Sequence, residues 1–255
     1  MNNSYYERVS IELLRIAPYQ QPRLNMLRAK SIAKSFDRTK LGALTVSKRN
    51  GIFYVVDGQH RLVASKISGE KDLMCLIIEG LTYAEECLRF ANQSENVKPV
   101  ESNHKFNALI EAEDSTALKI KATVNAAGVE LSCEKSKAPN RIIAISTIQS
   151  IFRQCGEENL SRTVRLIKET WDGETKSFDK EMLSGISLFL KTYGLEILDK
   201  KFVSQLQNIA PISIIREGNS DLSYTSSNSY VRYAKVIWKH YNKGLREQNK
   251  LSNKF

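Results

Sequence analysis

The sequence has little of what marks a membrane, secreted or metal-binding protein. It contains no apolar run of the roughly 18 residues that a membrane-spanning helix needs. Its start, from Met1 to Arg8, lacks the apolar core of a signal peptide. We therefore expect a cytoplasmic protein with no membrane contact.

Cysteine and histidine are also scarce. The four cysteines are Cys75, Cys87, Cys133 and Cys155, and no two of them form a Cys-x-x-Cys pair. The three histidines are His60, His104 and His240, and none is close to a cysteine in the sequence. Because zinc and redox sites need such ligands at short spacing, the sequence argues against both kinds of site.

What the sequence does have is an excess of positive charge, concentrated at its ends. The formal net charge is +10. Residues 1–100 contain 15 Lys and Arg against 10 Asp and Glu, residues 101–229 contain 16 against 17, and residues 230–255 contain 7 against 1. This asymmetry is typical of a chain that meets a polyanion such as nucleic acid, although an excess of this size can also serve solubility alone.

Residue patterns divide the chain into a mixed part and a helical part. In the first part, alternating or β-branched runs predict strands over residues 9–16, 43–47, 52–56 and 73–78, with helices over 24–36, 59–68 and 84–92. In the second part, apolar spacing predicts helices over 102–111, 115–127, 142–154, 160–171, 180–193 and 201–209. The predicted class is α+β, with a small α/β domain at 1–98 followed by an all-helical domain at 99–255.

Local signals add detail to this division. Asn50-Gly51 predicts a hairpin between two strands, and Thr82 followed by Glu85 predicts a capping box. The apolar run at 73–78 predicts a strand that is buried on both faces. Helical spacing predicts that Phe178, Met182, Ile186, Phe189 and Leu190 belong to the core of the second part.

The stretch Asp57-Gly58-Gln59-His60-Arg61 concentrates polar groups between a β-branched run and an apolar helical pattern, which predicts strand, tight turn and helix. Unpaired N–H groups at a helix start favour an anion, Gly58 lacks a Cβ that would block its approach, and Arg61 adds a fork that matches phosphate oxygens. This pattern predicts a phosphate or nucleotide pocket.

A plainer interpretation of the same stretch remains open. Asp57 could be an N-cap and Gly58 a turn residue, with the next three side chains in solvent. Arg61, however, lies at the end of the helix dipole that a carboxylate normally prefers. An anionic ligand would relieve this mismatch.

The last predicted helix has two different faces. Val231, Ala234, Trp238, Tyr241 and Leu245 form an apolar stripe, whereas Lys235, Lys239, Lys243, Arg246 and Lys250 form a basic one. The first four basic residues are the candidates for nucleic-acid contact, since each cation that neutralises a phosphate releases counterions. The alternative is a terminal helix that its lysines keep soluble.

Three stretches of the first hundred residues stand in an order known from one superfamily. They are residues 16–23 (IAPYQQPR), 57–64 (DGQHRLVA) and 95–101 (ENVKPVE). With them the chain resembles the ParB N-terminal domain and sulfiredoxin superfamily, in its Asp-Gly-Gln-His-Arg subgroup of phage, plasmid and DNA-modification contexts. The helical half resembles a domain that uncharacterised mobile-element proteins carry after this module.

The resemblance implies a ParB/sulfiredoxin-like fold that holds a nucleoside triphosphate, CTP or ATP, together with Mg²⁺. The implied nucleotide-binding residues are Gln20, Arg23, Asp57, Gly58, Gln59, His60, Arg61 and Asn96, and the implied metal ligand is Glu95. Gln59 stands where sulfiredoxin has its catalytic cysteine, so its reductase activity is not expected. The Glu-Arg pair of partition proteins is replaced by Gln59-His60, so specificity for CTP does not follow.

Three functional hypotheses remain open. The first is a nucleotide-binding, DNA-associated protein of the partition type from a phage, plasmid or other mobile element, with a homodimer left open. The second is an NTP hydrolase, kinase or nuclease, in which Asp57 or Glu95 is the base or metal ligand and His60 is an acid, base or phosphate stabiliser. The third is a protein-interaction module whose ancestral pocket is empty.

Overall fold

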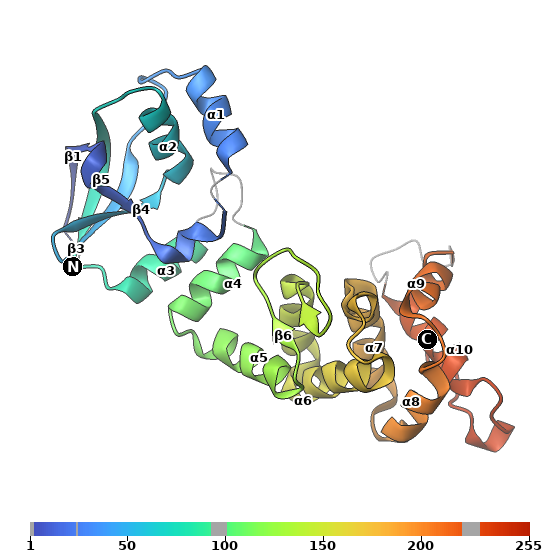
Figure 1. Cartoon of the computed structure of the whole chain (residues 1–255). Helices are drawn as coiled ribbons and strands as arrows, with labels where there is room; N and C mark the ends of the chain where they lie inside the picture. The colour runs from blue at the N-terminus through green and yellow to red at the C-terminus, as the bar shows by residue number, and fades with distance from the viewer. Residues whose placement is uncertain (1–2, 24, 93–100, 221–229) are drawn as a thin grey trace. The chain divides into compact units, whose positions relative to one another are not determined.

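The computed structural model describes residues 3–23, 25–92, 101–220 and 230–255 (Figure 1). The chain is an α+β protein whose residues form two units, 1–117 and 118–255. The boundary lies within helix α5 (Ser115–Ala126). The expected division into a nucleotide-binding domain at 1–98 and a helical domain at 99–255 stays a prediction.

A mixed five-stranded sheet organises the first unit. Its strands are β1 (Ser4–Ser10), β2 (Leu14–Ile16), β3 (Leu44–Arg49), β4 (Ile52–Asp57) and β5 (Asp72–Glu79), in the spatial order β1-β5-β3-β4-β2. β1 with β5 and β3 with β4 are antiparallel, whereas β3 with β5 and β2 with β4 are parallel. The β3–β4 connection is the predicted hairpin, because Asn50 and Gly51 both have positive φ, at 53° and 75°.

The two faces of this sheet have separate cores. Alternate strand residues such as Val46, Val55 and Cys75 pack with Leu62 of helix α2 (Gln59–Ile67) on one face. On the other face, helices α3 (Tyr83–Ala91) and α4 (Ser102–Glu111) pack with the 3-10 segment η2 (Pro18–Arg23). The sheet therefore lies between α2 and α3, and α1 (Met26–Lys34) packs against α2 (Figure 1).

The face under α3 contains a buried charge. Glu86 is fully buried, and its Oε1 accepts hydrogen bonds from Ser47 Oγ at 2.7 Å and from Arg49 Nε at 3.0 Å. The Arg49 guanidinium lies 4.5 Å from the ring centroid of Tyr54 and 5.3 Å from that of Tyr83. A buried carboxylate needs such a partner, so this pair fixes α3 to the sheet.

Two strand predictions in this unit were wrong in part. The strand expected over 9–16 is broken by the 3-10 turn η1 (Ile11–Leu13), where the Ile11 N–H bonds to Lys71 O at 3.0 Å. The break sends β1 to one edge of the sheet and β2 to the other. The strand β5 is not buried on both faces, since Met74 is 41% exposed.

In the described part of the second unit, helices predominate and the strands are a short parallel pair, β6 (Glu130–Leu131) and β7 (Arg141–Ile142), which the sequence did not reveal. Its helices are α6 (Ile145–Trp171), α7 (Lys180–Tyr193), α8 (Asp199–Leu206), α9 (Pro211–Ser220) and α10 (Val231–Asn242), with 3-10 segments η3 (Thr175–Phe178), η4 (Gly194–Glu196) and η5 (Glu247–Asn249). The two helices predicted over 142–171 form one span with a break at Gly156, where φ is 83° and ψ is 173°. Helix α9 was missed.

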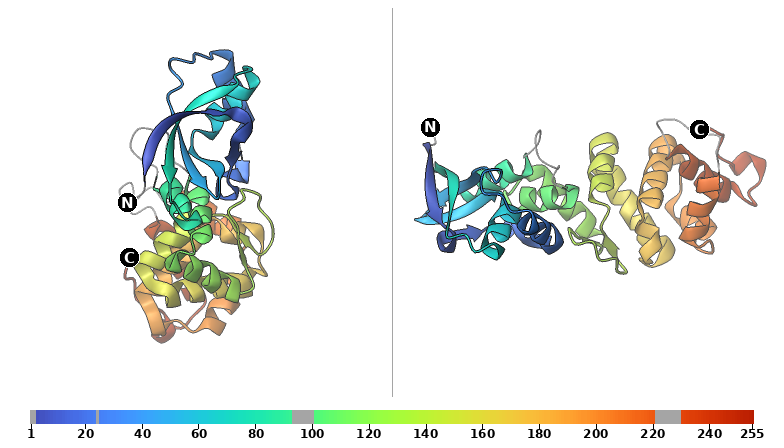
Figure 2. Two further views of the ribbon diagram at one scale, coloured as in Figure 1. Left: turned by 90° about the vertical axis from the view of Figure 1, so that its left-hand side faces the viewer. Right: turned by 90° about the horizontal axis from the view of Figure 1, so that it is seen from above.

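Helix α7 is the centre of this unit. It lies between α6 and α10 (Figure 2). All five predicted core residues, Phe178, Met182, Ile186, Phe189 and Leu190, are buried, which confirms that prediction. Among the residues that the structure describes, no helix combines the length and the apolar character that crossing a membrane requires.

Candidate functional site

The predicted strand, turn and helix are present at residues 52–67. Strand β4 ends at Asp57, Gly58 has φ 102° and ψ 20°, and α2 begins at Gln59. Gly58 is therefore the N-cap residue, and no side chain caps the helix. The interpretation of Asp57 as the N-cap was wrong.

Gly58 is required by the packing behind the turn. A Cβ at this position would lie 2.4 Å from Leu44 Cδ2 and 3.0 Å from Arg61 Nη2, on a backbone that L-residues rarely adopt. From the sequence we expected this glycine to allow the close approach of a ligand. The structure instead attributes it to contact with the protein's own side chains.

The Arg61 side chain points inward and ties the turn to the preceding loop. Its Nη1 donates to the carbonyl oxygens of Leu41 at 2.8 Å and Ala43 at 3.1 Å, and its Nη2 donates to Asp57 Oδ2 at 3.0 Å. The side chains of Arg61 and Asp57 are 27% and 30% exposed. Because three protein acceptors hold this guanidinium, its position sets the shape of the turn.

The first turn of α2 keeps the chemistry that favours an anion. It contains no acidic residue, and its first intrahelical bond runs from Leu62 N to Gly58 O at 2.9 Å. The amides of the three residues from Gln59 to Arg61 thus receive no side-chain cap. Uncapped N–H groups at the positive end of a helix dipole attract negatively charged groups.

His60 joins this turn to α1. Its Nε2 accepts a hydrogen bond from the backbone N–H of Asn25, the N-cap residue of α1, at 3.3 Å. Burial lowers the pKa of His60 from its usual value, and the charge of Arg28 lowers it further. Both effects favour the neutral imidazole, and because Nε2 accepts a hydrogen bond, we assign the proton of that neutral form to Nδ1.

Two glutamines beside the turn have buried oxygen atoms without hydrogen-bond partners. Gln20 is only 3% exposed, and its Nε2 donates to Val56 O at 2.6 Å, which fixes the orientation of the amide. The Oε1 atoms of Gln20 and Gln59 are both buried, and no donor among the described residues bonds to either. Buried acceptors of this kind normally bind a donor, such as water or a ligand hydroxyl or amine.

The structure therefore joins most of the predicted pocket residues to a single turn. Asp57, Gly58, Gln59, His60 and Arg61 form that turn. Gln20 reaches it through Val56. Glu95, Asn96 and the side chain of Arg23 lie outside the described residues.

The described part of the turn suits an anion better than a metal. Asp57 is its acidic residue, and Oδ2 of that carboxylate is paired with Arg61. Within the described ranges, no group of three or more His, Cys, Asp or Glu side chains could hold a metal ion. The predicted metal ligand Glu95 thus stays a prediction.

Several residues that shape the turn were missed. The carbonyls of Leu41 and Ala43 and the amide of Asn25 leave no side-chain pattern in the sequence. The one available signal was Gly42, which has φ 67° and would place a Cβ 3.4 Å from Arg61 Nη1.

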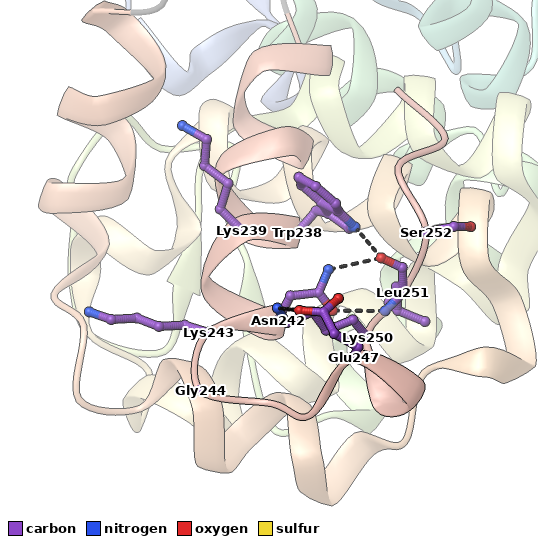
Figure 3. Close-up of a pocket in the computed structure, with 9 residues that line it drawn as sticks. All are labelled: Trp238, Lys239, Asn242, Lys243, Gly244, Glu247, Lys250, Leu251 and Ser252. Atoms are coloured by element: carbon purple, nitrogen blue, oxygen red, sulfur yellow. Dashed lines mark hydrogen bonds and ion pairs between the residues drawn. The ribbon is translucent and has the colours of Figure 1, made fainter.

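A second candidate is a surface groove of about 650 Å³ at the end of α10 (Figure 3). It is lined by Trp238, Lys239, Asn242, Lys243, Gly244, Glu247, Lys250, Leu251 and Ser252. The chain turns at Gly244 and returns, so that Asn242 Oδ1 accepts from Leu251 N at 2.8 Å while Asn242 Nδ2 donates to Leu251 O at 3.0 Å. Trp238 Nε1 donates to the same carbonyl at 3.0 Å.

The basic residues do not form the single helical stripe that we predicted. Helix α10 ends at Asn242, so Arg246 and Lys250 lie beyond it and Lys243 is its C-cap residue. Lys235 and Lys239 are on the helix, and Lys239 Nζ lies 3.5 Å from Glu217 Oε1. The helix ends early because the Asn242 side chain binds the returning chain.

A family model described as "Family of unknown function (DUF6551)" matches residues 16–255. No curated protein matches the sequence.

Three solved structures align with the chain at low identity. Two are pNOB8-like ParB N-domains. The C222₁ form has 13% sequence identity and a TM-score of 0.41, and the alignment covers 94% of this chain and 99% of that one. The other has 14% identity and a TM-score of 0.42, and its alignment covers 98% of this chain and 94% of that one. The third is a C-terminally truncated chromosome-partitioning protein ParB from Caulobacter crescentus, complexed with CTP-γ-S. It has 12% identity and a TM-score of 0.30, covering 63% of this chain and 98% of its own. Alignments with these TM-scores do not decide the fold or the function.

Replacing Gly58 by alanine should destabilise the protein much more than the same change at Gly51. Both glycines have positive φ, but a Cβ at Gly51 meets nothing within 4 Å, whereas one at Gly58 meets Leu44 and Arg61. We expect a loss of about 3 kcal/mol for Gly58→Ala and about 1 kcal/mol for Gly51→Ala in urea unfolding. Equal losses would show that the space behind the turn is not filled.

Acid should destabilise the protein partly through His60. Its pKa is lowered in the folded state, so below about pH 6.5 the unfolded chain takes up the proton first. The contribution of His60 to stability is thus intact above pH 6.5 and is lost as the pH falls towards the lowered pKa. Between pH 7.5 and 5.5, the unfolding free energy of His60→Gln should fall less than that of the wild type. An identical fall would contradict a lowered pKa of His60 in the folded state.

Proposed function

The chain belongs to the family of unknown function DUF6551, and we propose from its own residues that the first unit binds the phosphate groups of a nucleotide at the start of α2. The observation that carries this proposal is the first turn of that helix, which has neither a side-chain cap nor an acidic residue. Such a turn offers several N–H donors and a positive dipole end to one anion.

The surroundings of the turn support the proposal. Arg61 holds Asp57 and the Leu41 and Ala43 carbonyls in place, so the turn keeps its shape without a ligand. The Asp57 charge, which would repel phosphate, is balanced by Arg61. The main-chain amides of α2 are therefore the proposed phosphate donors, and Arg61 is their positioning residue.

The buried oxygen atoms of Gln20 and Gln59 concern the hydrogen-bond donors that a ligand could carry besides its phosphates. Phosphate oxygens only accept hydrogen bonds from the protein, so they leave the acceptors Gln20 Oε1 and Gln59 Oε1 unsatisfied. A ligand that also carries ribose hydroxyls or a base amine can supply the missing donors. Water can supply the same donors, so these two atoms are compatible with a nucleoside phosphate, and the choice of a nucleotide rests on the motif resemblance.

The remaining features of the proposal come from the motif resemblance. It implies CTP or ATP with Mg²⁺, with Arg23, Glu95 and Asn96 completing the pocket. The positive charge of residues 230–255 supports an association with DNA. A cytoplasmic partition-type protein of a mobile element, acting as a homodimer, is the role we propose on this basis.

Nucleoside triphosphates should raise the melting temperature of the full chain. At roughly a hundredfold excess over Kd we expect a rise of about 5 °C for at least one of the four, with Mg²⁺ present, and a smaller rise for inorganic tripolyphosphate. Gln59→Glu should abolish the rise, because it places a carboxylate in the first turn of α2 and repels phosphate. Gln207→Glu, an exposed position in the second unit, is the matched control and should keep it.

Two results would contradict the proposal. One is the absence of any shift with all four triphosphates in the wild type. The other is a shift that Gln59→Glu and Gln207→Glu both retain, which would place the ligand elsewhere.

A further inference from the structure

Positive charge is concentrated in the second unit. Residues 118–255 contain 22 Lys and Arg against 14 Asp and Glu, whereas residues 1–117 contain 16 against 14. The groove at the end of α10 lies within residues 230–255, where the ratio is 7 to 1. A ligand of this groove is therefore expected to be an anion.

Three polar side-chain atoms of the groove already bind the protein itself. The indole N–H of Trp238 and both ends of the Asn242 amide bind the backbone of Leu251. Trp238 is half-buried and held by this bond, so it offers a ligand ring surface rather than a hydrogen bond. An aromatic surface of this kind accepts a flat, apolar group such as a nucleobase.

The cations around the groove remain accessible. Lys243 lines the groove, and Arg246 lies in the sequence between the lining residues Gly244 and Glu247; both are exposed and neither forms an ion pair with any residue that the structure describes. Lys239 and Lys250 pair with Glu217 and Glu247, but these pairs are solvent-exposed and therefore weak. Figure 3 shows the Lys239 and Lys243 side chains on one side of the helix, whereas Trp238 faces Leu251 on the other side.

We propose that this groove binds single-stranded nucleic acid, with a base against Trp238 and phosphates on Lys243, Lys239 and Arg246. The volume of about 650 Å³ accommodates a nucleotide. Unpaired bases expose the faces that can stack on Trp238, whereas a duplex hides them and offers only phosphates. This inference deepens the proposed association with DNA and is independent of nucleotide binding in the first unit.

The test uses tryptophan fluorescence of the full chain. The other tryptophan, Trp171, is only 8% exposed, so quenching by a ligand reports mainly on Trp238. An oligothymidylate of about 15 nucleotides should quench the emission, and its duplex with oligoadenylate should quench it much less. Trp238→Phe, which keeps an aromatic ring in place, should remove the quenching.

Charge variants test the binding of phosphates. Lys243→Glu with Arg246→Glu should weaken oligothymidylate binding at least tenfold and reduce the slope of log K against log salt by about 0.7 for each phosphate that the variant no longer neutralises. Lys121→Glu with Arg153→Glu makes the same change in net charge at exposed positions on α5 and α6, which supply no residue that lines the groove. This control should lose much less affinity. Glu217→Gln, which releases Lys239, should bind more tightly than the wild type.

Three outcomes would overturn the inference. Equal quenching by duplex would mean that base faces are not recognised. Equal losses in the two double variants would mean that only net charge matters. Equal quenching by polyglutamate would indicate an acidic peptide as the ligand. Because nucleotide-induced stabilisation is measured separately, each of these failures leaves the proposed phosphate site unaffected.

Discussion

The ion pair between Arg61 and Asp57 is the interaction on which the candidate phosphate site depends. The two residues are four apart in the sequence, Asp57 at the end of β4 and Arg61 in the first turn of α2. The Arg61 guanidinium also donates hydrogen bonds to the carbonyl oxygens of Leu41 and Ala43. With the guanidinium in this position, only glycine fits at residue 58. The helix therefore begins without a capping side chain, and no side chain accepts a hydrogen bond from its first amides.

The rest of the first unit supports this turn from both sides of the sheet. Gln20 in η2 holds Val56 through its side-chain amide, and η2 itself packs against α4. Glu86 and Arg49 fix α3 on the same face. His60 connects the turn to the start of α1. A site held by several elements keeps its geometry in the absence of ligand, which reduces the entropic cost of binding.

Sequence patterns predicted the elements whose signals are local. The Asn50-Gly51 hairpin, the Thr82–Glu85 capping box and the apolar face of α7 are all present, because each depends on neighbouring residues. The break at η1 depends on Lys71, 60 residues along the chain, and the early end of α10 depends on Leu251 in the returning segment, and neither contact follows from the helical or strand pattern. For the same reason the motif predicted the strand, turn and helix at residues 52–67 but not that Arg61 would point inward.

A titration of the full chain with a nucleoside triphosphate, followed by ¹⁵N–¹H NMR, tests the central claim most directly. The account predicts that the amides of Gln59, His60 and Arg61 shift in proportion to bound ligand. The first amides of α3 should stay unchanged, because Thr82 and Glu85 already cap that helix. Unchanged amides at the start of α2, or equal shifts at the start of α3, would contradict the account.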